Sequence, residues 1–371
     1  MSADAVTLPA YDRGKLSLLG MPGPRLIEFF ENLDEKPYRA RQIMRWLYQR
    51  HENDFDAMTD LSATLRKQLA EMTTLALPPV LKREQSDDGT CKWLLDVGAG
   101  QAIETVYIPE PNRGTLCISS QAGCALDCAF CATGHQGFNR NLSSAEILSQ
   151  VVLAAREIAP AKITNVVFMG MGEPLANYRN VLPVVQLLID DQAYGLSRRR
   201  VTISTAGMVP QIAKLATDCN VALAVSLHAP TDELRNRLVP INRVHPIAEL
   251  LDACWAYAAG QASRQITFEY VLLDGVNDSV PQARQLIKLL RNRPAKVNLI
   301  PFNAFPESEF KCSAQPAIDA FWKTLRDGGL IATTRRPRGD DIAAACGQLA
   351  GRVSDRQRVR LGDRVMGASS R

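Results

Sequence analysis

Hydrophobic positions in the first part of the chain recur at helical spacing. Apolar side chains return every three or four residues in three segments, 26–30, 40–48 and 61–69. This is the period of an amphipathic helix. The pair Pro78-Pro79 then breaks the pattern, because proline fixes its backbone and lacks an amide donor. We therefore predict an N-terminal helical accessory domain over residues 1–75.

A β-rich stretch follows, in which apolar and polar residues alternate. Its strand candidates are 80–84, 91–97 and 102–108, separated by Asp- and Gly-containing turn sequences. We predict a short β-meander over residues 76–113. Glu104 lies in its third strand on the same face as Val106, because successive side chains alternate between faces. A carboxylate on an apolar face either turns outward at a bulge or is kept for a purpose, and burial would raise its proton affinity as a general base requires.

From residue 114 onward, apolar strands alternate with longer amphipathic segments. The strand candidates are 115–119, 165–169, 200–204, 221–227, 265–272, 296–300 and 330–333. Helices are predicted between them, among them 145–158, 181–190, 281–290 and 317–326. Repeated βα units favour parallel strands in a whole or partial α/β barrel, whose reactive face lies at the carboxyl ends of the strands. We assign residues 114–345 to this core and 346–371 to a C-terminal segment.

Composition narrows the class of protein. The chain has 371 residues, 46% of them hydrophobic, and contains no run of eighteen apolar residues that would predict a membrane span. Its first residues lack the basic and apolar regions of a secretion signal. Nine cysteines outside any small disulfide-rich module fit a reducing compartment. We therefore expect a cytoplasmic enzyme, and we expect it to be a monomer.

Positive charge is distributed unevenly. The net charge of +4 is too small to indicate nucleic-acid binding by itself, but residues 352–371 hold six arginines and two aspartates. Residues 36–50 combine Arg39, Arg41 and Arg45 with Trp46, a mixture that suits phosphates and stacked bases. An ordinary surface helix with solvated arginines explains that segment equally simply and is favoured when the segment is considered alone.

Three closely spaced cysteines carry the strongest chemical signal. Cys124, Cys128 and Cys131 form the pattern C-x3-C-x2-C in a loop after the first predicted barrel strand. Three thiolates hold three corners of a four-iron cluster and leave the fourth iron open to a substrate, whereas an electron carrier uses four protein ligands. A zinc site with His135 as the fourth ligand is the alternative. Three buried structural cysteines are a weaker alternative, because the flanking Gln121 and Asp127 suit a loop.

A second motif follows the next predicted strand. Gly170 and Gly172 allow backbone amides to approach a ligand, and the Glu173 carboxylate can accept hydrogen bonds from an ammonium group or a ribose hydroxyl. Taken alone, the glycines also suit a simple strand-to-helix turn.

The cysteine loop and the Gly-Met-Gly-Glu-Pro strand end together resemble the radical S-adenosylmethionine superfamily, which has a partial (β/α)6 barrel. Motifs along nearly the whole chain resemble, more narrowly, the dual-specificity ribosomal and transfer RNA adenine-C2 methyltransferases of the RlmN family. These motifs include Val-Thr-Ile-Ser-Thr-Ala-Gly, Ser-Leu-His-Ala-Pro and the C-terminal Arg-Arg-Pro-Arg-Gly-Asp-Asp-Ile-Ala-Ala-Ala-Cys. The resemblance implies a [4Fe-4S] cluster on the three cysteines and two molecules of S-adenosylmethionine per turnover.

The same resemblance assigns roles to individual residues. It implies that S-adenosylmethionine is contacted by Gly172, Glu173, Ser204, Ser226, Leu227, His228 and Asn303. Cys346 would carry the methyl group as S-methylcysteine and then link covalently to the base. Glu104 would remove the proton from carbon 2, and Cys117 would release the product through a transient disulfide with Cys346. From the sequence around it, Cys346 lies just past Arg335, Arg336 and Arg338, so we expect an accessible thiol whose anion is favoured.

The resemblance also implies partners. The substrates would be an adenosine of 23S ribosomal RNA at the peptidyl transferase centre and an anticodon-loop adenosine of transfer RNA, and a reductant such as flavodoxin would supply electrons. Given an RNA substrate, RNA contacts by the segment with Arg39, Arg41, Arg45 and Trp46 become the favoured interpretation. Two alternatives stay open: the related adenine-C8 ribosomal RNA methyltransferase, which shares the cluster motifs, and a zinc-stabilised RNA-binding protein without catalysis.

Overall fold

A single ten-stranded sheet organises the chain. The computed structural model describes residues 14–259, 265–336 and 338–356, and the strand order in the sheet is β14-β13-β12-β11-β10-β9-β6-β5-β4-β3. Adjacent strands from β6 to β14 in this order are parallel. They are β6 (Arg113–Cys117), β9 (Asn165–Phe168), β10 (Val201–Thr205), β11 (Ala222–Ser226), β12 (Ile266–Leu272), β13 (Ala295–Pro301) and β14 (Ile331–Thr334). These seven strands coincide with the seven predicted segments to within two residues at each end.

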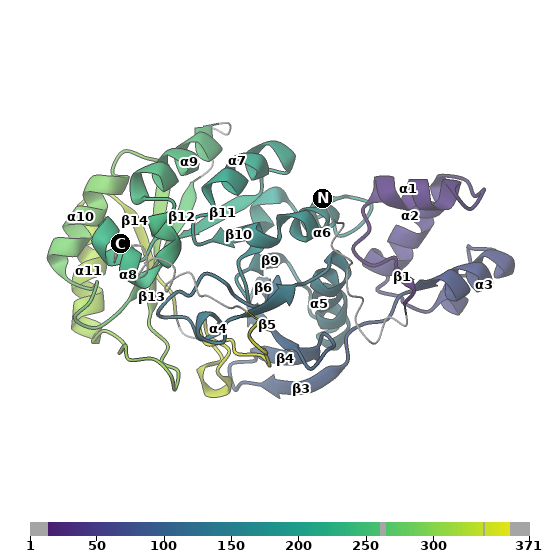
Figure 1. Ribbon diagram of the computed structural model, residues 1–371, viewed down its shortest axis with the longest axis horizontal. Helices are drawn as coiled ribbons and strands as arrows, with labels where there is room; N and C mark the ends of the chain where they lie inside the picture. Colours follow the sequence, from purple (N-terminus) through teal and green to yellow (C-terminus); the bar gives the residue numbers. More distant parts are fainter. Residues whose placement is uncertain (1–13, 260–264, 337, 357–371) are drawn as a thin grey trace.

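Helices connect the parallel strands and cover one face of the curved sheet (Figure 1). The connecting helices are α5 (Ser144–Glu157), α6 (Tyr178–Ile189), α7 (Val209–Asp218), α8 (Asp232–Leu238), α9 (Ile247–Ala259), α10 (Val280–Leu290) and α11 (Gln315–Asp327). Capping boxes fix the starts of α5 at Ser143 and of α10 at Ser279, where each side chain accepts a backbone N–H that the helix leaves free. The predicted α/β class and partial barrel are confirmed.

The meander extends the barrel sheet. Strands β3 (Val80–Gln85), β4 (Cys91–Asp96) and β5 (Ala102–Glu110) are antiparallel, and β5 also pairs antiparallel with β6. In this register Val106 lies opposite Cys117, and directly opposed side chains share one face of a sheet. Glu104, two residues before Val106, therefore lies on the same face as Cys117. Thr105 faces the other way, toward α5, where its hydroxyl donates to Gln150 at 2.5 Å.

The N-terminal unit forms the narrower end of the molecule (Figure 1). Its helices are α1 (Gly23–Glu31), α2 (Tyr38–Met44), which continues as a π-helical turn over Arg45–Gln49, and α3 (Ala63–Met72), with the two-residue strands β1 (Leu16–Ser17) and β2 (Thr73–Thr74) between their ends. The unit contacts α5, where Arg156 Nε donates to the His51 carbonyl oxygen at 2.6 Å. The predicted helical character of this region is thus observed.

The chain after β14 returns across the meander and the cysteine loop. We call residues 338–356 the C-terminal strap. Arg352 and Ala102 exchange two backbone hydrogen bonds, of 2.8 and 3.0 Å. The strap also receives hydrogen bonds beside the cysteine loop, from Thr133 Oγ1 to the Leu349 carbonyl at 2.7 Å and from Gln136 Nε2 to the Gly351 carbonyl at 2.9 Å. The strap is therefore attached on both sides of the barrel mouth.

Within the described part of the chain, none of the helices has both the length and the apolar surface needed to cross a bilayer.

Candidate active site

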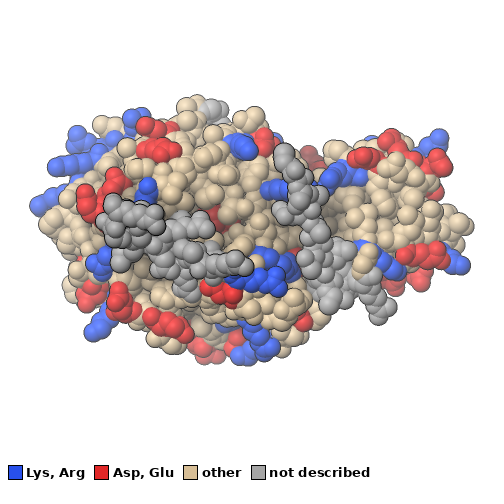
Figure 2. Space-filling view, in the orientation of Figure 1, with Lys and Arg blue, Asp and Glu red and all other residues tan. Residues whose placement is uncertain are grey.

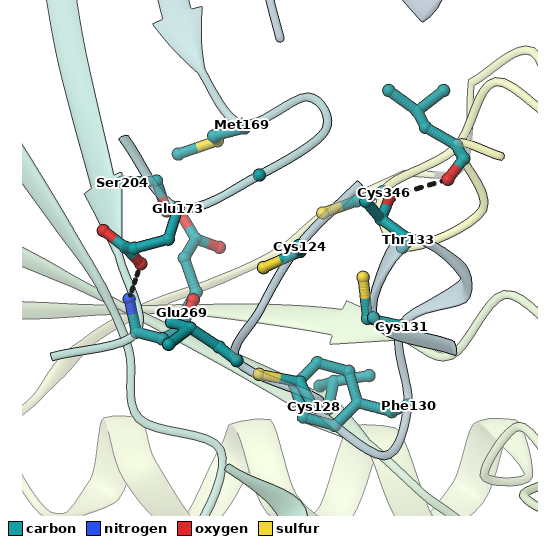
Figure 3. A pocket seen from close by; sticks show the side chains of 18 of the residues that line it. Cys124, Cys128, Phe130, Cys131, Thr133, Met169, Glu173, Ser204, Glu269 and Cys346 are labelled. Carbon is teal, nitrogen blue, oxygen red and sulfur yellow. Dashed lines mark hydrogen bonds between the residues drawn. The ribbon is translucent and has the colours of Figure 1, made fainter. Parts of the chain in front are cut away.

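A cavity of about 1020 Å³, partly open to solvent, lies at the carboxyl ends of the parallel strands. Residues in or directly after the carboxyl-terminal halves of β9, β10, β11, β12 and β13 contribute to its wall, together with the cysteine loop and the C-terminal strap. Figure 3 shows Cys124, Cys128, Cys131 and Cys346 around this space, with Glu173 across from them. This is the position at which a barrel of parallel strands places its reactive groups.

Backbone hydrogen bonds hold the cysteine loop to its neighbouring segments. It runs between the short strands β7 (Gln121–Gly123) and β8 (Phe138–Asn141) and leads into α4 (Ala132–His135), none of which the hydrophobic pattern predicts. The Cys124 N–H donates to the Gly137 carbonyl at 2.7 Å, and the Ala129 N–H donates to the Leu238 carbonyl at the end of α8 at 3.1 Å. The loop conformation is thus fixed by backbone hydrogen bonds before any metal binds.

The three thiols fit an iron–sulfur cluster. Burial raises the pKa of Cys124, Cys128 and Cys131, so without metal these thiols hold their protons. Metal binding replaces those protons and returns a negatively charged ligand set. Because all three side chains line one cavity that has room beside them, the donor set suits three irons with a fourth position left open.

His135 does not complete a zinc site with these thiols. Its Nε2 lies 3.0 Å from the Ala129 carbonyl oxygen, and its ring packs edge-on against Phe305, with 5.2 Å between ring centroids. The imidazole is therefore occupied within the loop, and the arrangement gives no support to the zinc alternative.

Glu173 is a buried carboxylate in the cavity wall. Only 4% of the residue is exposed, and its two oxygens accept backbone hydrogen bonds from Leu175 at 3.0 Å and Ala206 at 2.8 Å. Burial raises its pKa to about 7, although these two N–H groups oppose the increase. A cationic ligand in the cavity would return the group to its charged form. Gly172, with φ of +97°, lies against Gln121, where a side chain would have no room.

Other residues expected to contact S-adenosylmethionine divide between the cavity and its surroundings. Ser204, Ser226 and His228 line the cavity together with Gly172 and Glu173. His228 Nδ1 accepts the Val271 N–H at 3.0 Å. Burial lowers the pKa of His228 to about 3, so the ring is neutral and its Nε2–H is a donor.

Leu227 and Asn303 lie outside the cavity wall. The Leu227 side chain is fully buried, and its carbonyl accepts from Arg235 at 3.1 Å. Asn303 lines a smaller neighbouring pocket, and its amide donates to the Cys346 carbonyl at 3.2 Å. The geometry therefore supports contact of Leu227 with Arg235 at the end of β11, and contact of Asn303 with the strap. It does not support direct contact of either residue with a ligand in the cavity.

Cys346 brings a fourth sulfur to the cavity from the strap. It is half-buried and lines both the large cavity and the neighbouring pocket. The expectation that its anion is favoured is wrong in direction, because burial raises the Cys346 pKa and the Arg335 guanidinium only opposes part of this increase. The pKa of Cys117 is also raised, to about 12. Burial is the main cause, and the negative charge of an ionised Cys346 raises the pKa further. None of the nine cysteines forms a disulfide.

Comparison with known proteins identifies the family. Residues 16–75 match the model of the ribosomal RNA large subunit methyltransferase N-terminal domain, and residues 118–287 match that of the radical SAM superfamily. A curated dual-specificity RNA methyltransferase RlmN from Alkalilimnicola ehrlichii is 54% identical over 345 residues, which cover 92% of this chain and 96% of the relative. The chain belongs to the RlmN family of radical S-adenosylmethionine RNA methyltransferases.

The crystal structure of a radical SAM methyltransferase from Sphaerobacter thermophilus agrees with this assignment. It superposes with a TM-score of 0.86 at 46% identity, covering 90% of this chain and 99% of that one. Membership of the RlmN family implies a [4Fe-4S] cluster and S-adenosylmethionine as cofactors. It also decides against a zinc-stabilised protein without catalysis.

In this RlmN family member Glu104 lies under the strap rather than in the cavity wall. The residue is 6% exposed; its Oε1 lies 3.1 Å from Lys92 Nζ, and its Oε2 accepts the Ala350 N–H at 2.9 Å. Lys92 is itself buried and also lies 3.5 Å from Glu84. The predicted face is observed. Of the two alternatives, the carboxylate is not turned outward at a bulge but is buried beside Lys92. Lys92, which lies between apolar residues in strand β4, was the signal that could have revealed this partner.

The N-terminal cationic segment differs in part from expectation. The Trp46 side chain is buried, its indole N–H donates to Asp60 at 2.6 Å, and the Arg50 guanidinium covers its ring at 3.9 Å. Arg39 pairs with Glu35 at 3.1 Å. The prediction that Trp46 offers a face to stacked bases is therefore wrong, whereas Arg41 and Arg45 are exposed.

Proposed function

We propose that this chain methylates carbon 2 of adenosines in ribosomal and transfer RNA, with Cys346 as the methyl carrier. The observation that carries the proposal is the position of Cys346, which lines the cavity together with Cys124, Cys128 and Cys131. A thiol in the wall of the cofactor cavity can receive a group from the cofactor, and Cys117, the last residue of β6, is proposed as the second thiol that releases it. The family assignment supports the RNA substrates.

The chemistry of the target explains why a carrier is needed. Carbon 2 of adenine lies between two ring nitrogens and is electron-poor, so it cannot attack an electrophilic methyl group. Bound at the cluster, S-adenosylmethionine supplies both that methyl group and, after one-electron cleavage, a 5′-deoxyadenosyl radical. Gly172, Glu173, Ser204, Ser226 and His228 would hold the cofactor, since these residues line the cavity.

Cys346 takes part first. Its sulfur gives up its proton and would form a bond to the methyl carbon as the bond from that carbon to the sulfonium sulfur breaks, with S-adenosylhomocysteine as the leaving group. The Arg335 guanidinium favours the thiolate that this step requires. The S-methyl group would then lose one hydrogen atom to the 5′-deoxyadenosyl radical, and the resulting sulfur-bound carbon radical would add to carbon 2 and link Cys346 to the RNA. This adduct is itself a radical, so it would return one electron to the oxidised cluster before it loses a proton. Glu104 then takes the carbon-2 proton. Because its Oε2 accepts the Ala350 N–H, the strap must release that contact for the carboxylate to reach the base.

Cys117 completes the reaction. Its sulfur attacks the Cys346 sulfur, an S–S bond forms as the sulfur–carbon bond breaks, and the electron pair leaves with the carbon, which takes up a proton as a methyl group. The disulfide is transient and must be reduced before the next turnover. Cys117 and Glu104 share one face of the β5–β6 pair, which supports their action on one substrate.

RNA binding would extend beyond the cavity. We assign it to the N-terminal unit (residues 1–75), where Arg41 and Arg45 are exposed. Residues 76–113 would then supply the general base Glu104. Residues 114–345 would hold the cluster and its cofactor, and residues 346–371 would supply the methyl carrier Cys346. On the face shown in Figure 2, basic and acidic side chains are interspersed, so local groups of arginines rather than one broad field would meet the phosphates.

The test is an anaerobic assay of the cluster-loaded protein with unmodified ribosomal or transfer RNA, S-adenosylmethionine and a chemical reductant. Digested RNA is compared with 2-methyladenosine and 8-methyladenosine by mass spectrometry. We expect 2-methyladenosine from the wild type and from Cys312→Ala, a matched control at an exposed cysteine. Cys346→Ala should take up the cluster and give no methylated base. Product at carbon 8, or full methylation by Cys346→Ala, would overturn the proposal.

A further inference from the structure

Arg235 is a fully buried cation beneath the cavity. It lies in α8, has an exposed fraction of 0%, and is one of the largest fully buried side chains of the described chain. Its guanidinium donates to the carbonyl oxygens of Ala206 at 2.6 Å, Ser226 at 2.9 Å and Leu227 at 3.1 Å, and to Asn242 Oδ1 at 2.8 Å. These carbonyls end the strands β10 and β11. Arg235 thus joins two strand ends that contribute to the cavity wall.

No carboxylate balances this charge directly. None of the ion pairs within 4.0 Å among residues 14–259, 265–336 and 338–356 includes Arg235. The nearest acidic residue along α8, Asp232, instead accepts hydrogen bonds from Asn242 Nδ2 and the Ile247 N–H, each at 2.9 Å. A buried cation without a counter-ion is strongly unfavourable. Its hydrogen bonds to four oxygens offset part of this cost, and a negatively charged cofactor beside it would offset more.

The cysteine loop, which would bind a negatively charged cluster, contacts the end of the helix that contains Arg235. Leu238, the last residue of α8, accepts the Ala129 N–H, and Ala129 directly follows Cys128. The loop also contacts the end of β11, because the Phe130 ring packs edge-on against His228 with 4.4 Å between centroids. Helix α8 thus holds the loop and places its buried cation behind it.

We propose that Arg235 raises the reduction potential of the cluster bound by Cys124, Cys128 and Cys131. A four-iron cluster on three thiolates is negatively charged, and its charge becomes more negative by one when it accepts an electron. A fixed buried cation attracts the reduced form more strongly than the oxidised form, and the effect is large where water is excluded. Arg235 does not touch the reacting atoms, so it is a positioning residue that acts through the cluster.

The test is a redox titration of cluster-loaded Arg235→Gln in the absence of RNA, followed by the low-temperature electron paramagnetic resonance signal of the reduced cluster. At a given solution potential we expect the ratio of reduced to oxidised cluster to fall about tenfold, which is about 59 mV for a one-electron couple. Arg237→Gln is the matched control, since Arg237 is an exposed arginine of the same helix. Water screens an exposed charge, so its potential should equal that of the wild type.

Two further variants separate the effect of the Arg235 charge from the effect of its hydrogen bonds. Arg235→Lys keeps the cation but loses the planar fork, so its potential should stay near the wild-type value. If Arg235→Gln cannot be loaded, Asp232→Asn gives the answer with the opposite sign, because removing this acidic neighbour leaves the Arg235 charge less opposed and should raise the potential.

The proposal is overturned if fully loaded Arg235→Gln keeps the wild-type potential. It is also overturned if Arg235→Lys and Arg235→Gln shift equally, or if Asp232→Asn lowers the potential. Because the titration involves no RNA, these outcomes leave the proposed methylation of carbon 2 unaffected.

Discussion

Glu173→Gln tests the most perturbed carboxylate of the cavity wall. Burial raises the Glu173 pKa from 4.5 to about 7 in the folded protein. A carboxyl group with a raised pKa stabilises the folded state fully below pH 4.5, and this contribution is lost as the pH rises through about 7. The unfolding free energy of the cluster-free protein is therefore lower at alkaline than at acidic pH, because ionised Glu173 is poorly solvated in the folded state.

The magnitude follows from the two pKa values. The interval from 4.5 to about 7, at about 1.36 kcal/mol per pH unit, limits the loss to about 3.4 kcal/mol. Linkage gives a loss of about 2.0 kcal/mol at pH 6 and about 3.3 kcal/mol at pH 8. The glutamine side chain of the variant does not titrate. Its amide has one acceptor oxygen instead of two, and the hydrogen bond lost in this way lowers the unfolding free energy by the same amount at both pH values. The difference in unfolding free energy between wild type and variant should thus change by about 1.3 kcal/mol from pH 6 to pH 8, at the expense of the wild type.

The assay is urea unfolding of the cluster-free protein and of Glu173→Gln at both pH values, under reducing conditions. Other groups titrate alike in both proteins and cancel in the comparison. This includes His228, which is neutral in the folded protein because its pKa there is about 3, but titrates in the unfolded chain. Glu71→Gln, at an exposed carboxylate of α3, is the control and should show no such slope. A difference between wild type and Glu173→Gln that does not change with pH, or that favours the wild type at pH 8, would refute the reasoning.

Three other variants probe different parts of the molecule. Cys117→Ala should accumulate a covalent protein–RNA adduct, seen as slower migration in a denaturing gel, because adduct formation precedes the step that needs this thiol; free methylated RNA at normal yield would contradict it. Lys92→Met leaves Glu104 buried without its partner at 3.1 Å and should cost about 3–5 kcal/mol of unfolding free energy, most of which Lys92→Met combined with Glu104→Gln should recover. Gly20→Ala places a methyl group 2.5 Å from the Ser144 backbone at φ +74°, so proteolysis between the N-terminal unit and the barrel should become faster, with unchanged susceptibility as the contrary result.

Strands were predictable from the sequence because their burial is simple. In a parallel sheet covered by helices, both faces of a strand are apolar, and segments such as 165–169 stand out between polar loops; the observed strand is Asn165–Phe168. The alternation in β5 likewise placed Glu104 on the correct face. Strands β7 and β8 were missed because they have three and four residues and are held by local hydrogen bonds, which leave no periodic pattern.

The candidate site was only partly predictable. The spacing of the cysteines identifies the loop, because ligands to one cluster must be close, and these are near in sequence. Cys117 and Cys346 are far apart in sequence, so no local pattern joins them, and only the family resemblance links their proposed roles. Arg235 follows Leu234 and precedes Leu238 at helical spacing, which is a signal for an inward-facing cation, but its meaning depends on strand ends that only the fold brings together.

Two arginines from different elements lie near the sulfur groups of the site. Arg235 is buried in α8, whose last residue holds the cysteine loop, whereas the half-buried Arg335 lines the smaller pocket together with Cys346. A radical enzyme that also uses thiols as nucleophiles faces conflicting demands, since the cluster must accept an electron while the carrier thiol must become an anion. One shared cation would couple these two properties. Separate cations on separate elements, α8 and the chain after β14, allow the potential of the cluster and the nucleophilicity of the carrier to be set independently.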